Sequence, residues 1–313
     1  MPLSLAENKT INKMKNFKST FVLLTLLFQA SLSHSQQYHP FSQLPPATGH
    51  YARLQALGSE ANPVNQWKDQ LSFPAELYND AMLYQLIRPI YLTTAQVDSL
   101  KLLPTFPANS SEQTQKELKF LLQLQAERTP EQVEEVLELG KVGYWPEVDL
   151  SPLHPQYRNN LQHLFYEVRK VLGEEYTSEN SPHTAALLKG IMNDMRLMEF
   201  SVKYSSLRAR PYQLESSLQP LQQMKSPSFT SGHTLWAYLQ AFTLAELIPS
   251  KRQAFLDLAY EIGLSREIMG VHFPSDEEEA RKLAFAMLQL MWQKEQFKED
   301  FLKAASEWTT LQQ

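Results

Sequence analysis

Three short blocks between residues 203 and 276 decide how this sequence is interpreted: KYSSLRARP at 203–211, SGH at 231–233 and SREIMGVHFPSD at 265–276. They place Lys, Arg, His and Asp side chains at fixed spacings on either side of a glycine turn. Cationic side chains and a glycine turn suit the binding of a phosphate, and histidines with a carboxylate suit nucleophilic and proton-transfer chemistry. Each block alone is more typical of a turn or a helix end, but the three in this order favour a functional site.

The phosphate-binding part of this hypothesis rests on cations and on the glycine. Arg210 and Arg266 each carry a planar guanidinium that can donate two parallel hydrogen bonds to adjacent oxygens, and Lys203 adds a point charge. Ser231 can donate its hydroxyl hydrogen, and Gly232 lets the backbone approach an anion closely. The apolar run that follows reads as a helix, so we expect the Ser-Gly turn at a helix N-terminus, where anions are favoured.

The two histidines and the aspartate can supply the remaining chemistry. One neutral imidazole can attack phosphorus, and a second, protonated imidazole can give its proton to the leaving alkoxide. A carboxylate can fix the tautomer of the attacking ring and support the charge that develops on it. His272 and Asp276 are four residues apart, so they can reach each other if their segment is helical.

In this order the blocks resemble the signature of the type 2 phosphatidic acid phosphatase (PAP2) superfamily, which reads K-x6-R-P, P-S-G-H and S-R-x5-H-x3-D. The superfamily includes bacterial class A non-specific acid phosphatases, membrane lipid phosphatases and vanadium haloperoxidases. The sequence around the blocks is most similar to the class A acid phosphatases, and the similarity covers roughly residues 100 to 305. This resemblance implies a phosphoric monoester hydrolase with a helical bundle fold.

The resemblance also implies roles for individual residues. His272 would be the nucleophile, Asp276 its partner and His233 the general acid, while the phosphate would be held by Lys203, Arg210, Ser231, Gly232, His233 and Arg266. It implies no metal and no cofactor, although vanadate mimics phosphate and occupies the same residues in the haloperoxidases. Arg208 falls where the subgroup often has a basic residue. Thr230 stands where the family has proline, so we expect a slightly looser turn, a cap for the next helix and no loss of chemistry.

The first residues resemble an export signal. A basic stretch at 14–18 precedes an apolar run at 21–30 and a small-x-small cleavage pattern at 33–35. We therefore expect a signal peptide over residues 1–35, with Met14 as an alternative true start, and a periplasmic or secreted protein. The alternative is an uncleaved anchor, but the apolar run is too short to span a bilayer comfortably.

Composition excludes several classes of protein. The 313 residues include no cysteine, which rules out disulfides, thiolate catalysis and cysteine-based metal sites. The net charge is −5, and no basic run is long enough to follow a nucleic-acid backbone. We therefore expect small phosphomonoester substrates, no nucleic acid and no integral membrane domain, and leave a homo-oligomer open.

The pattern of helical segments predicts an all-α bundle, because β-branched runs and period-two alternation are rare. We expect an N-terminal extension of unassigned function over residues 36–100, as a cover over the core or a partner surface, and a PAP2-type phosphatase domain over residues 101–313. Apolar periodicity and cap residues predict helices over 73–92, 111–128, 129–139, 157–172, 182–209, 231–247, 250–269, from 275 onward, and over 294–308.

Local signals refine some of these helices. Pro211 is expected to stop the helix over 182–209, and Ser250 and Ser275 each open a capping-box pattern. Asp276 would then lie in the first turn of its helix. The acidic run 277–279 is expected to be a solvated face, because three adjacent carboxylates cannot share one helix face as metal ligands.

The sequence thus favours an exported, metal-independent acid phosphatase that hydrolyses phosphate monoesters through a phosphohistidine. Two alternatives keep the site: a phosphatase of lipid phosphates or diphosphates at a membrane surface, and a vanadate-dependent haloperoxidase. An alternative of another class is a binding or assembly protein that works through residues 36–100.

Overall fold

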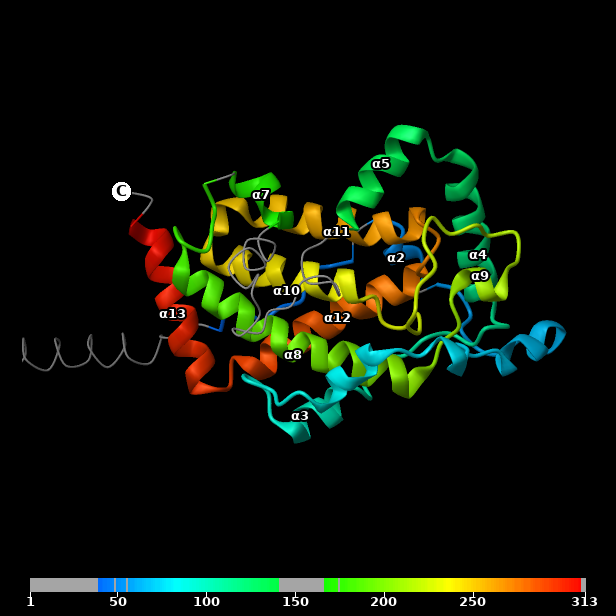
Figure 1. Ribbon diagram of the computed structural model, residues 1–313, viewed down its shortest axis with the longest axis horizontal. Coiled ribbons are helices and arrows are strands. Elements are labelled where there is room, and N and C mark those ends of the chain that lie inside the picture. Colours follow the sequence, from blue (N-terminus) through cyan, green and yellow to red (C-terminus); the bar gives the residue numbers. More distant parts are fainter. Residues whose placement is uncertain (1–38, 48, 55, 141–165, 174, 311–313) are drawn as a thin grey trace, which may run out of the picture. The chain divides into compact units, whose positions relative to one another are not determined.

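The fold is organised around α10 (Gly232–Leu247), a helix that is buried on every side. All of its residues except Glu246 are buried. A helix that is apolar all round must lie inside a bundle, since it has no face to present to water. It packs against α11 (Arg252–Ile268), α12 (Pro274–Met291) and α8 (Pro182–Ser206), and Figure 1 shows it between them.

The computed structural model describes residues 39–47, 49–54, 56–140, 166–173 and 175–310. The expected signal peptide lies outside these residues, as does most of the helix expected over 157–172, of which α7 (Tyr166–Leu172) is described. The chain from Phe41 onward forms one compact unit. In the described ranges no β-strand forms and the sole bridge joins Ser72 to Arg208, which confirms the predicted all-α bundle.

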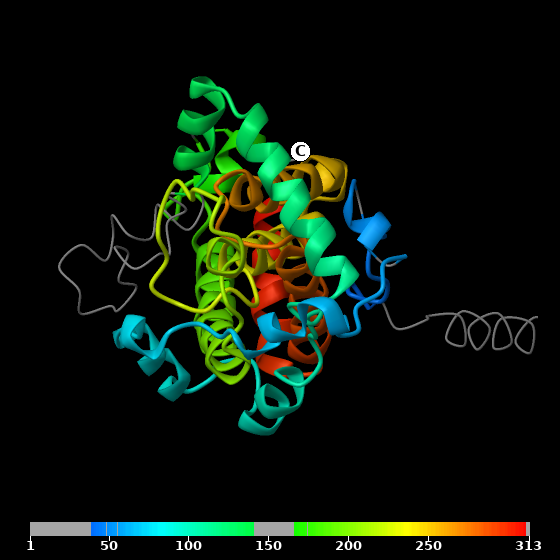
Figure 2. The same cartoon turned by 90° about the vertical axis from the view of Figure 1, so that its right-hand side faces the viewer.

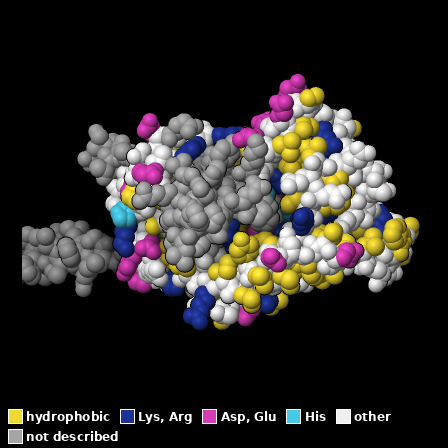
Figure 3. Space-filling view, in the orientation of Figure 1, with side chains coloured by type: hydrophobic (Ala, Val, Ile, Leu, Met, Phe, Trp, Pro, Cys, Tyr) yellow, Lys and Arg dark blue, Asp and Glu magenta, His cyan; other side chains and the backbone are white. Residues whose placement is uncertain are grey.

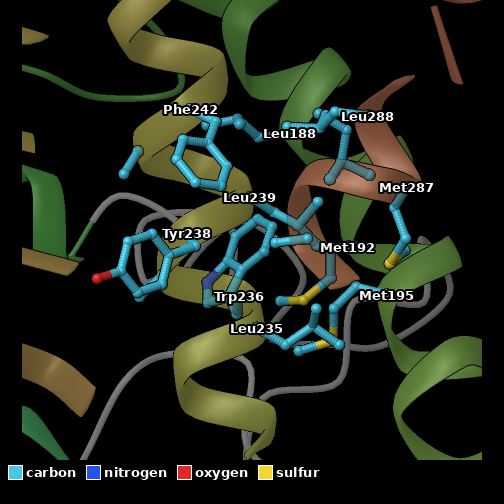
Figure 4. Close-up of a cluster of buried hydrophobic side chains, with 14 of the residues drawn as sticks. Leu188, Met192, Met195, Leu235, Trp236, Tyr238, Leu239, Phe242, Met287 and Leu288 are labelled. Atoms are coloured by element: carbon cyan, nitrogen blue, oxygen red, sulfur yellow. The ribbon is translucent and has the colours of Figure 1, made fainter. Parts of the chain in front are cut away.

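The main core lies where α10 meets its neighbours. Trp236 and Phe242 of α10 lie against Leu188 and Met192 of α8 and Leu288 of α12 (Figure 4). Burying one such side chain contributes roughly 1.5–3 kcal/mol, so this cluster is a major source of stability in a chain without disulfides. Among the described helices none combines the length and apolar character needed to cross a bilayer.

Two helices begin where the sequence predicted their starts, and in each a side chain caps the first turn. Ser111 Oγ accepts a hydrogen bond from Thr114 N at 3.1 Å at the start of α4 (Glu112–Glu127). Thr129 Oγ1 accepts one from Gln132 N at 3.2 Å at the start of α5 (Pro130–Leu139). These caps are local, so sequence alone locates them. The chain closes with α13 (Glu295–Thr310).

Other predicted boundaries were wrong. The helix expected over 182–209 ends at Ser206, because Leu207 turns into the left-handed region with a φ of 49°. Arg208 and Arg210 therefore lie in the segment after the helix, and Pro211 begins α9 (Pro211–Leu214) instead of stopping α8. Ser250 does not cap α11, since it lies inside the 3-10 turn η4 (Pro249–Lys251).

The start of α12 also differs from the predicted capping box. The helix begins at Pro274, one residue before Ser275. Asp276 does lie in the first turn, where its Oδ2 accepts a hydrogen bond from Phe273 N at 3.0 Å. The carboxylate thus holds the chain where it enters the helix.

Residues 41–100, the N-terminal arm, contain short helices in place of the single helix expected over 73–92. Asn79 interrupts that segment, because its Oδ1 accepts a hydrogen bond from Ala81 N and starts a new 3-10 turn. The elements of the arm are α2 (Tyr51–Leu54), η1 (Pro63–Gln70), η2 (Ala75–Leu77), η3 (Asp80–Leu86) and α3 (Thr94–Leu100). In Figures 1 and 2 the part of the arm from 75 to 100 runs along the outside of the bundle beside α8.

The arm is fastened to the bundle by buried apolar residues and by one carboxylate. Phe41, Tyr91 and Leu92 belong to the same hydrophobic cluster as α10. Asp194 on α8 accepts hydrogen bonds from three consecutive backbone amides, Ile90 N at 2.6 Å, Tyr91 N at 2.8 Å and Leu92 N at 2.7 Å. We call this contact the Asp194 clamp.

Candidate active site

The predicted site residues come from the ends of several helices that meet in the bundle. They lie at the end of α8 (Lys203), in the segment after it (Arg208, Arg210), at the start of α10 (Ser231, Gly232, His233), in the last turn of α11 (Arg266) and around the start of α12 (His272, Asp276). All of these side chains are buried. Helix ends leave backbone groups unpaired, so they are natural places to bind and orient polar groups.

The ring of His272 is held between a cation and a carboxylate. Its Nδ1 lies 3.3 Å from Asp276 Oδ2, and its Nε2 lies 3.0 Å from Nη1 of Arg210. A guanidinium can only donate, so Nε2 must accept and the ring proton must be on Nδ1. Burial and the Arg210 guanidinium hold the pKa of His272 well below its usual range, so the ring is neutral and Nε2 presents an electron pair.

Asp276 accepts several further hydrogen bonds. Ser228 Oγ donates to its Oδ2 at 2.6 Å, and Arg208 Nη1 donates to its Oδ1 at 2.7 Å. Burial by itself would raise the pKa of this carboxyl, but Arg208, His272 and Ser228 outweigh burial and hold the pKa well below its usual range. Asp276 therefore stays ionised and fixes the tautomer of His272.

Arg208 contacts the other carboxylate oxygen of Asp276 and bridges two carboxylates. In addition to Asp276, it faces Glu117 on α4, with 3.6 Å between Nη2 and Oε2. Its guanidinium carbon lies 4.0 Å from the ring centroid of Phe273. Glu117 also accepts from Ser275 N at 3.1 Å and from Ser275 Oγ at 2.9 Å, so it ties α4 to the start of α12.

Sequence reasoning missed Glu117 and Ser228. Glu117 had a signal, because it lies at helical spacing from Thr114 and Leu121 on the buried face of α4. A charged residue on such a face needs a buried partner. Burial raises the pKa of Glu117 to about 7, although the positive charge of Arg208 acts to lower it. Ser228 had no comparable signal, since its contact depends on tertiary structure.

Lys203 and Arg210 hold the loop that precedes α10. Lys203 Nζ donates to the carbonyl oxygens of Pro227 at 2.9 Å, Ser228 at 3.2 Å and Thr230 at 2.7 Å. Arg210 donates from Nε to Ser226 O at 2.9 Å and from Nη1 to Val271 O at 2.7 Å. Burial and the nearby Arg210 lower the pKa of Lys203 to about 7.

The Ser-Gly turn lies at the start of α10, as the sequence predicted. Ser231 Oγ accepts from Thr234 N at 3.4 Å, and Ser231 N donates to Asp276 O at 3.4 Å, which sets the start of α10 beside the start of α12. The cap expected from Thr230 is therefore supplied by Ser231. Thr230 Oγ1 is buried and has no hydrogen-bond partner among the described residues. A Cβ at Gly232 would lie 2.0 Å from Glu199 Oε1, so any other residue there would have to displace the Glu199 carboxylate.

His233 and Arg266 lie together at the end of α5. His233 Nε2 is 3.1 Å from the carbonyl oxygen of Gly140, and because that oxygen accepts, Nε2 must donate. A Cβ at Gly140 would lie 2.8 Å from Nη1 of Arg266, so this glycine gives the guanidinium room. Arg266 Nη1 also contacts Met269 Sδ at 2.9 Å. Burial and Arg266 hold the pKa of His233 well below its usual range.

The acidic run at 277–279 is not the solvated face that the sequence predicted. Glu277 is buried and accepts a hydrogen bond from Thr234 Oγ1, because the first turn of α12 packs under the start of α10. Glu278 is also buried and pairs with Arg281, with 2.7 Å between Nε and Oε2. Within the described ranges no three His, Asp or Glu side chains gather so as to hold a metal ion.

A cavity of about 220 Å³ lies next to this network. Its lining includes Tyr84 of the arm, Arg196 and Phe200 of α8, and Ser226, which also accepts hydrogen bonds from Arg210. The arm and α8 thus both line a cavity that reaches Ser226, a hydrogen-bond partner of Arg210.

Comparison with known proteins gives a family match for part of the chain. Residues 184–300 match the PAP2 superfamily. A non-specific acid phosphatase of Providencia stuartii is 28% identical over 148 residues, which cover 45% of this chain and 60% of that protein. One of Salmonella typhimurium is 31% identical over 128 residues, which cover 38% and 51%. The chain therefore spans only half to three fifths of the length of these relatives.

Two solved structures match part of the chain. A bacterial vanadium-dependent iodoperoxidase matches with a TM-score of 0.52 at 16% identity, over 78% of this chain and 64% of that one. A transmembrane PAP2-type phosphatidylglycerolphosphate phosphatase of Bacillus subtilis matches with a TM-score of 0.42 at 20% identity, over 65% and 92%. The match to the iodoperoxidase supports the helical architecture described above.

Proposed function

Because residues 184–300 match the PAP2 superfamily, we propose that this protein hydrolyses phosphate monoesters through a phosphohistidine on His272. The relatives that are named non-specific acid phosphatases support this proposal. The observation that carries it is the fixed ring of His272, whose Nδ1–H points to Asp276 and whose Nε2 electron pair accepts from Arg210, a donor that would turn to the phosphate oxygens when substrate binds. This is the arrangement that a nitrogen nucleophile needs.

In the first step, Nε2 of His272 attacks phosphorus and the ester P–O bond breaks. The electron pair of that bond leaves with the alkoxide oxygen, which takes a proton from protonated His233 and departs as an alcohol. Arg210 lies 3.0 Å from Nε2, where its guanidinium can neutralise charge on the equatorial oxygens. Asp276 supports the positive charge on the ring.

In the second step, water attacks the phosphoryl group of the intermediate. His233, now neutral, takes a proton from that water, and the N–P bond breaks with its electron pair returning to Nε2. Phosphate then leaves. Lys203 keeps the 227–230 loop in place through the three carbonyl oxygens described above.

Activity should be highest at mildly acidic pH. His233 must be protonated, and because its pKa is lowered, activity is lost as the pH rises. A bound phosphate dianion raises that pKa by its negative charge, which helps the ring to hold its proton. The pKa of His272 is lowered too, so the nucleophile stays neutral as the pH falls.

The test is hydrolysis of a small chromogenic phosphomonoester with EDTA present, from about pH 4 to about pH 9. His272→Ala should abolish turnover and also the acid-labile phosphoenzyme trapped by rapid quenching. His183→Ala, at an exposed position on α8, is the matched control and should keep both. Full activity of His272→Ala would overturn the assignment of the nucleophile.

We propose that the reaction uses no metal or cofactor, because buried arginines and a lysine supply the positive charge. EDTA should therefore leave the rate unchanged, and vanadate should inhibit by taking the place of phosphate. Iodide oxidation by vanadate-loaded protein without phosphatase activity would favour the haloperoxidase alternative instead. Export is proposed from the leader pattern, and fractionation of cells that produce a tagged chain tests it.

A further inference from the structure

Helix α8 carries a buried carboxylate, Glu199, that the reaction above does not use. Its side chain is 1% exposed, and neither carboxylate oxygen has a hydrogen-bond partner among the described residues. A buried carboxylate normally accepts several hydrogen bonds, because it loses its contacts with water. The nearest cation is Lys203, with 3.9 Å between Nζ and Oε1, and its three hydrogens point to the loop carbonyls.

The carboxylate of Glu199 lies against the Ser-Gly turn. A Cβ built on Gly232 would lie 2.0 Å from Oε1 and 2.4 Å from Cδ of Glu199. Arg196 and Lys203 lie one turn before and one turn after Glu199 on the same face of α8. Arg210 acts on it from the segment that follows α8. The carboxylate therefore lies among the groups that would bind a phosphate.

We propose that Glu199 determines which anion the site accepts: its carboxylate takes the place of an anion in the ligand-free chain, and phosphate enters when Glu199 carries a proton. The protonated side chain then donates a hydrogen bond to a phosphate oxygen. This inference rests on the proposed phosphatase function, and it names a specificity-determining residue that the three sequence blocks do not contain.

The electrostatics of Glu199 agree with this role. Burial raises its pKa to about 7, against the opposing effects of Lys203, Arg196 and Arg210. The part of α10 that packs against the Glu199 carboxylate is the backbone of Gly232. Near neutral pH both forms of Glu199 are therefore populated. A phosphate dianion repels the ionised form, so binding is coupled to uptake of one proton.

The test compares the wild type with Glu199→Gln, which keeps the shape and can donate from its amide at every pH. Above neutral pH, the inhibition constant for inorganic phosphate should rise more steeply in the wild type than in Glu199→Gln. The ratio of the two inhibition constants, wild type over variant, should increase about tenfold per pH unit. The ionisation of phosphate itself is common to both proteins and cancels in this ratio. In calorimetry at about pH 8, wild type should take up about one more proton per phosphate than the variant.

Glu246→Gln is the matched control, because Glu246 lies at the far end of α10 and pairs with Arg252 at 2.7 Å. It should keep the wild-type proton uptake. Glu199→Asp shortens the side chain and withdraws it from Gly232, so it should show a weaker pH effect, and it serves as the test if Glu199→Gln does not fold.

An unchanged pH dependence in Glu199→Gln, or loss of phosphate binding at every pH in that folded variant, would overturn the inference. Either result leaves wild-type hydrolysis intact and so leaves the proposed function standing. A wild type that binds phosphate with proton uptake but forms no phosphoenzyme would instead refute the proposed function.

Discussion

Two regions of the chain invert the usual relation between polarity and burial. Residues 64–103 of the arm and its connection to α4 expose large apolar side chains, among them Val64, Trp67, Leu86 and Leu102. Figure 3 shows apolar side chains gathered on the part of the surface where this segment runs in Figure 1. Residues 199–281 bury charged ones, among them Lys203, Arg208, Arg210, Arg266, Asp276 and Glu277. In the second region most charges have a partner from another segment, whereas the apolar side chains of the first are largely exposed.

The difference teaches that polarity alone does not rank these positions. Burying a charge costs free energy unless the charge is paired and hydrogen-bonded. Removal of one partner therefore leaves the other buried and unpaired, which destabilises the fold. Replacement of an exposed leucine changes the free energy of unfolding little. We therefore expect the effect of a substitution to follow the number of buried partners that it removes.

The largest effect is expected for Arg208→Ala, which tests the buried region. It leaves Asp276 and Glu117 without their shared cation, and breaking a buried pair in this way costs about 3–5 kcal/mol. Denaturant unfolding should show that loss, and kcat should fall because Asp276 no longer holds His272. Arg53→Ala, at an exposed position, is the control. Unfolding that matches the control would contradict the proposed bridge.

Phe41→Ala tests whether buried residues of the arm behave as core. Phe41 packs edge-on against Trp292 and Phe301, with ring centroids 6.1 and 6.2 Å away. Its removal should cost about 3 kcal/mol through lost contacts and a cavity. The kcat should stay unchanged, since none of these rings touches the site. A fall in kcat without a change in stability would show that the arm acts on catalysis directly.

A smaller effect is expected for His50→Ala, which cuts a polar link between the arm and α11. His50 Nε2 lies 3.1 Å from Oε1 of Glu267, and its Nδ1 lies 3.2 Å from Tyr260 Oη. Loss of these bonds should cost about 1–2 kcal/mol.

The pH dependence of this cost has a definite sign. Burial raises the pKa of Glu267, and His50 acts to lower it. Since His50→Ala removes that lowering effect, the pKa of Glu267 should be higher in the variant than in the wild type. A raised carboxyl pKa gives stability at low pH that is lost as the pH rises. The difference from wild type in unfolding free energy should therefore be greater at about pH 8 than at about pH 5. A larger difference at the lower pH would contradict this assignment.

The smallest effect is expected for Leu86→Ser on η3. The side chain is 78% exposed, so the change should alter the unfolding free energy by less than about 0.5 kcal/mol. Hydrolysis of a soluble phosphomonoester should be unchanged. A large loss of stability would mean that the exposed apolar surface is covered in solution, and light scattering on both proteins would then reveal the association.

Structural features that depend on residues close together in the sequence were predicted correctly. The helix starts after Ser111, Thr129 and Ser231 depend on local residues, and they were found. The end of α8 was missed, because Leu207 turns left-handed in response to its tertiary surroundings. The contacts of Ser228 and Glu117 join residues far apart in the chain, so their partners could not be predicted, although the spacing of Glu117 indicated that it is buried.

The acidic run shows the same limit within the site. Three adjacent acids are typical of a solvated helix end, and only packing against Thr234 explains why Glu277 is buried. The three blocks indicate which residue types come together. They do not indicate Glu199, whose place beside Gly232 follows from the path of α8.

The Asp194 clamp determines the order in which the arm can come away from the bundle. One carboxylate holds three successive amides, so residues 90–92 cannot leave singly and must be released in one event. Fraying will start on both sides of the clamp and stop there. In deuterium exchange these amides will be the slowest of the arm, and their rate will report the opening of the whole interface.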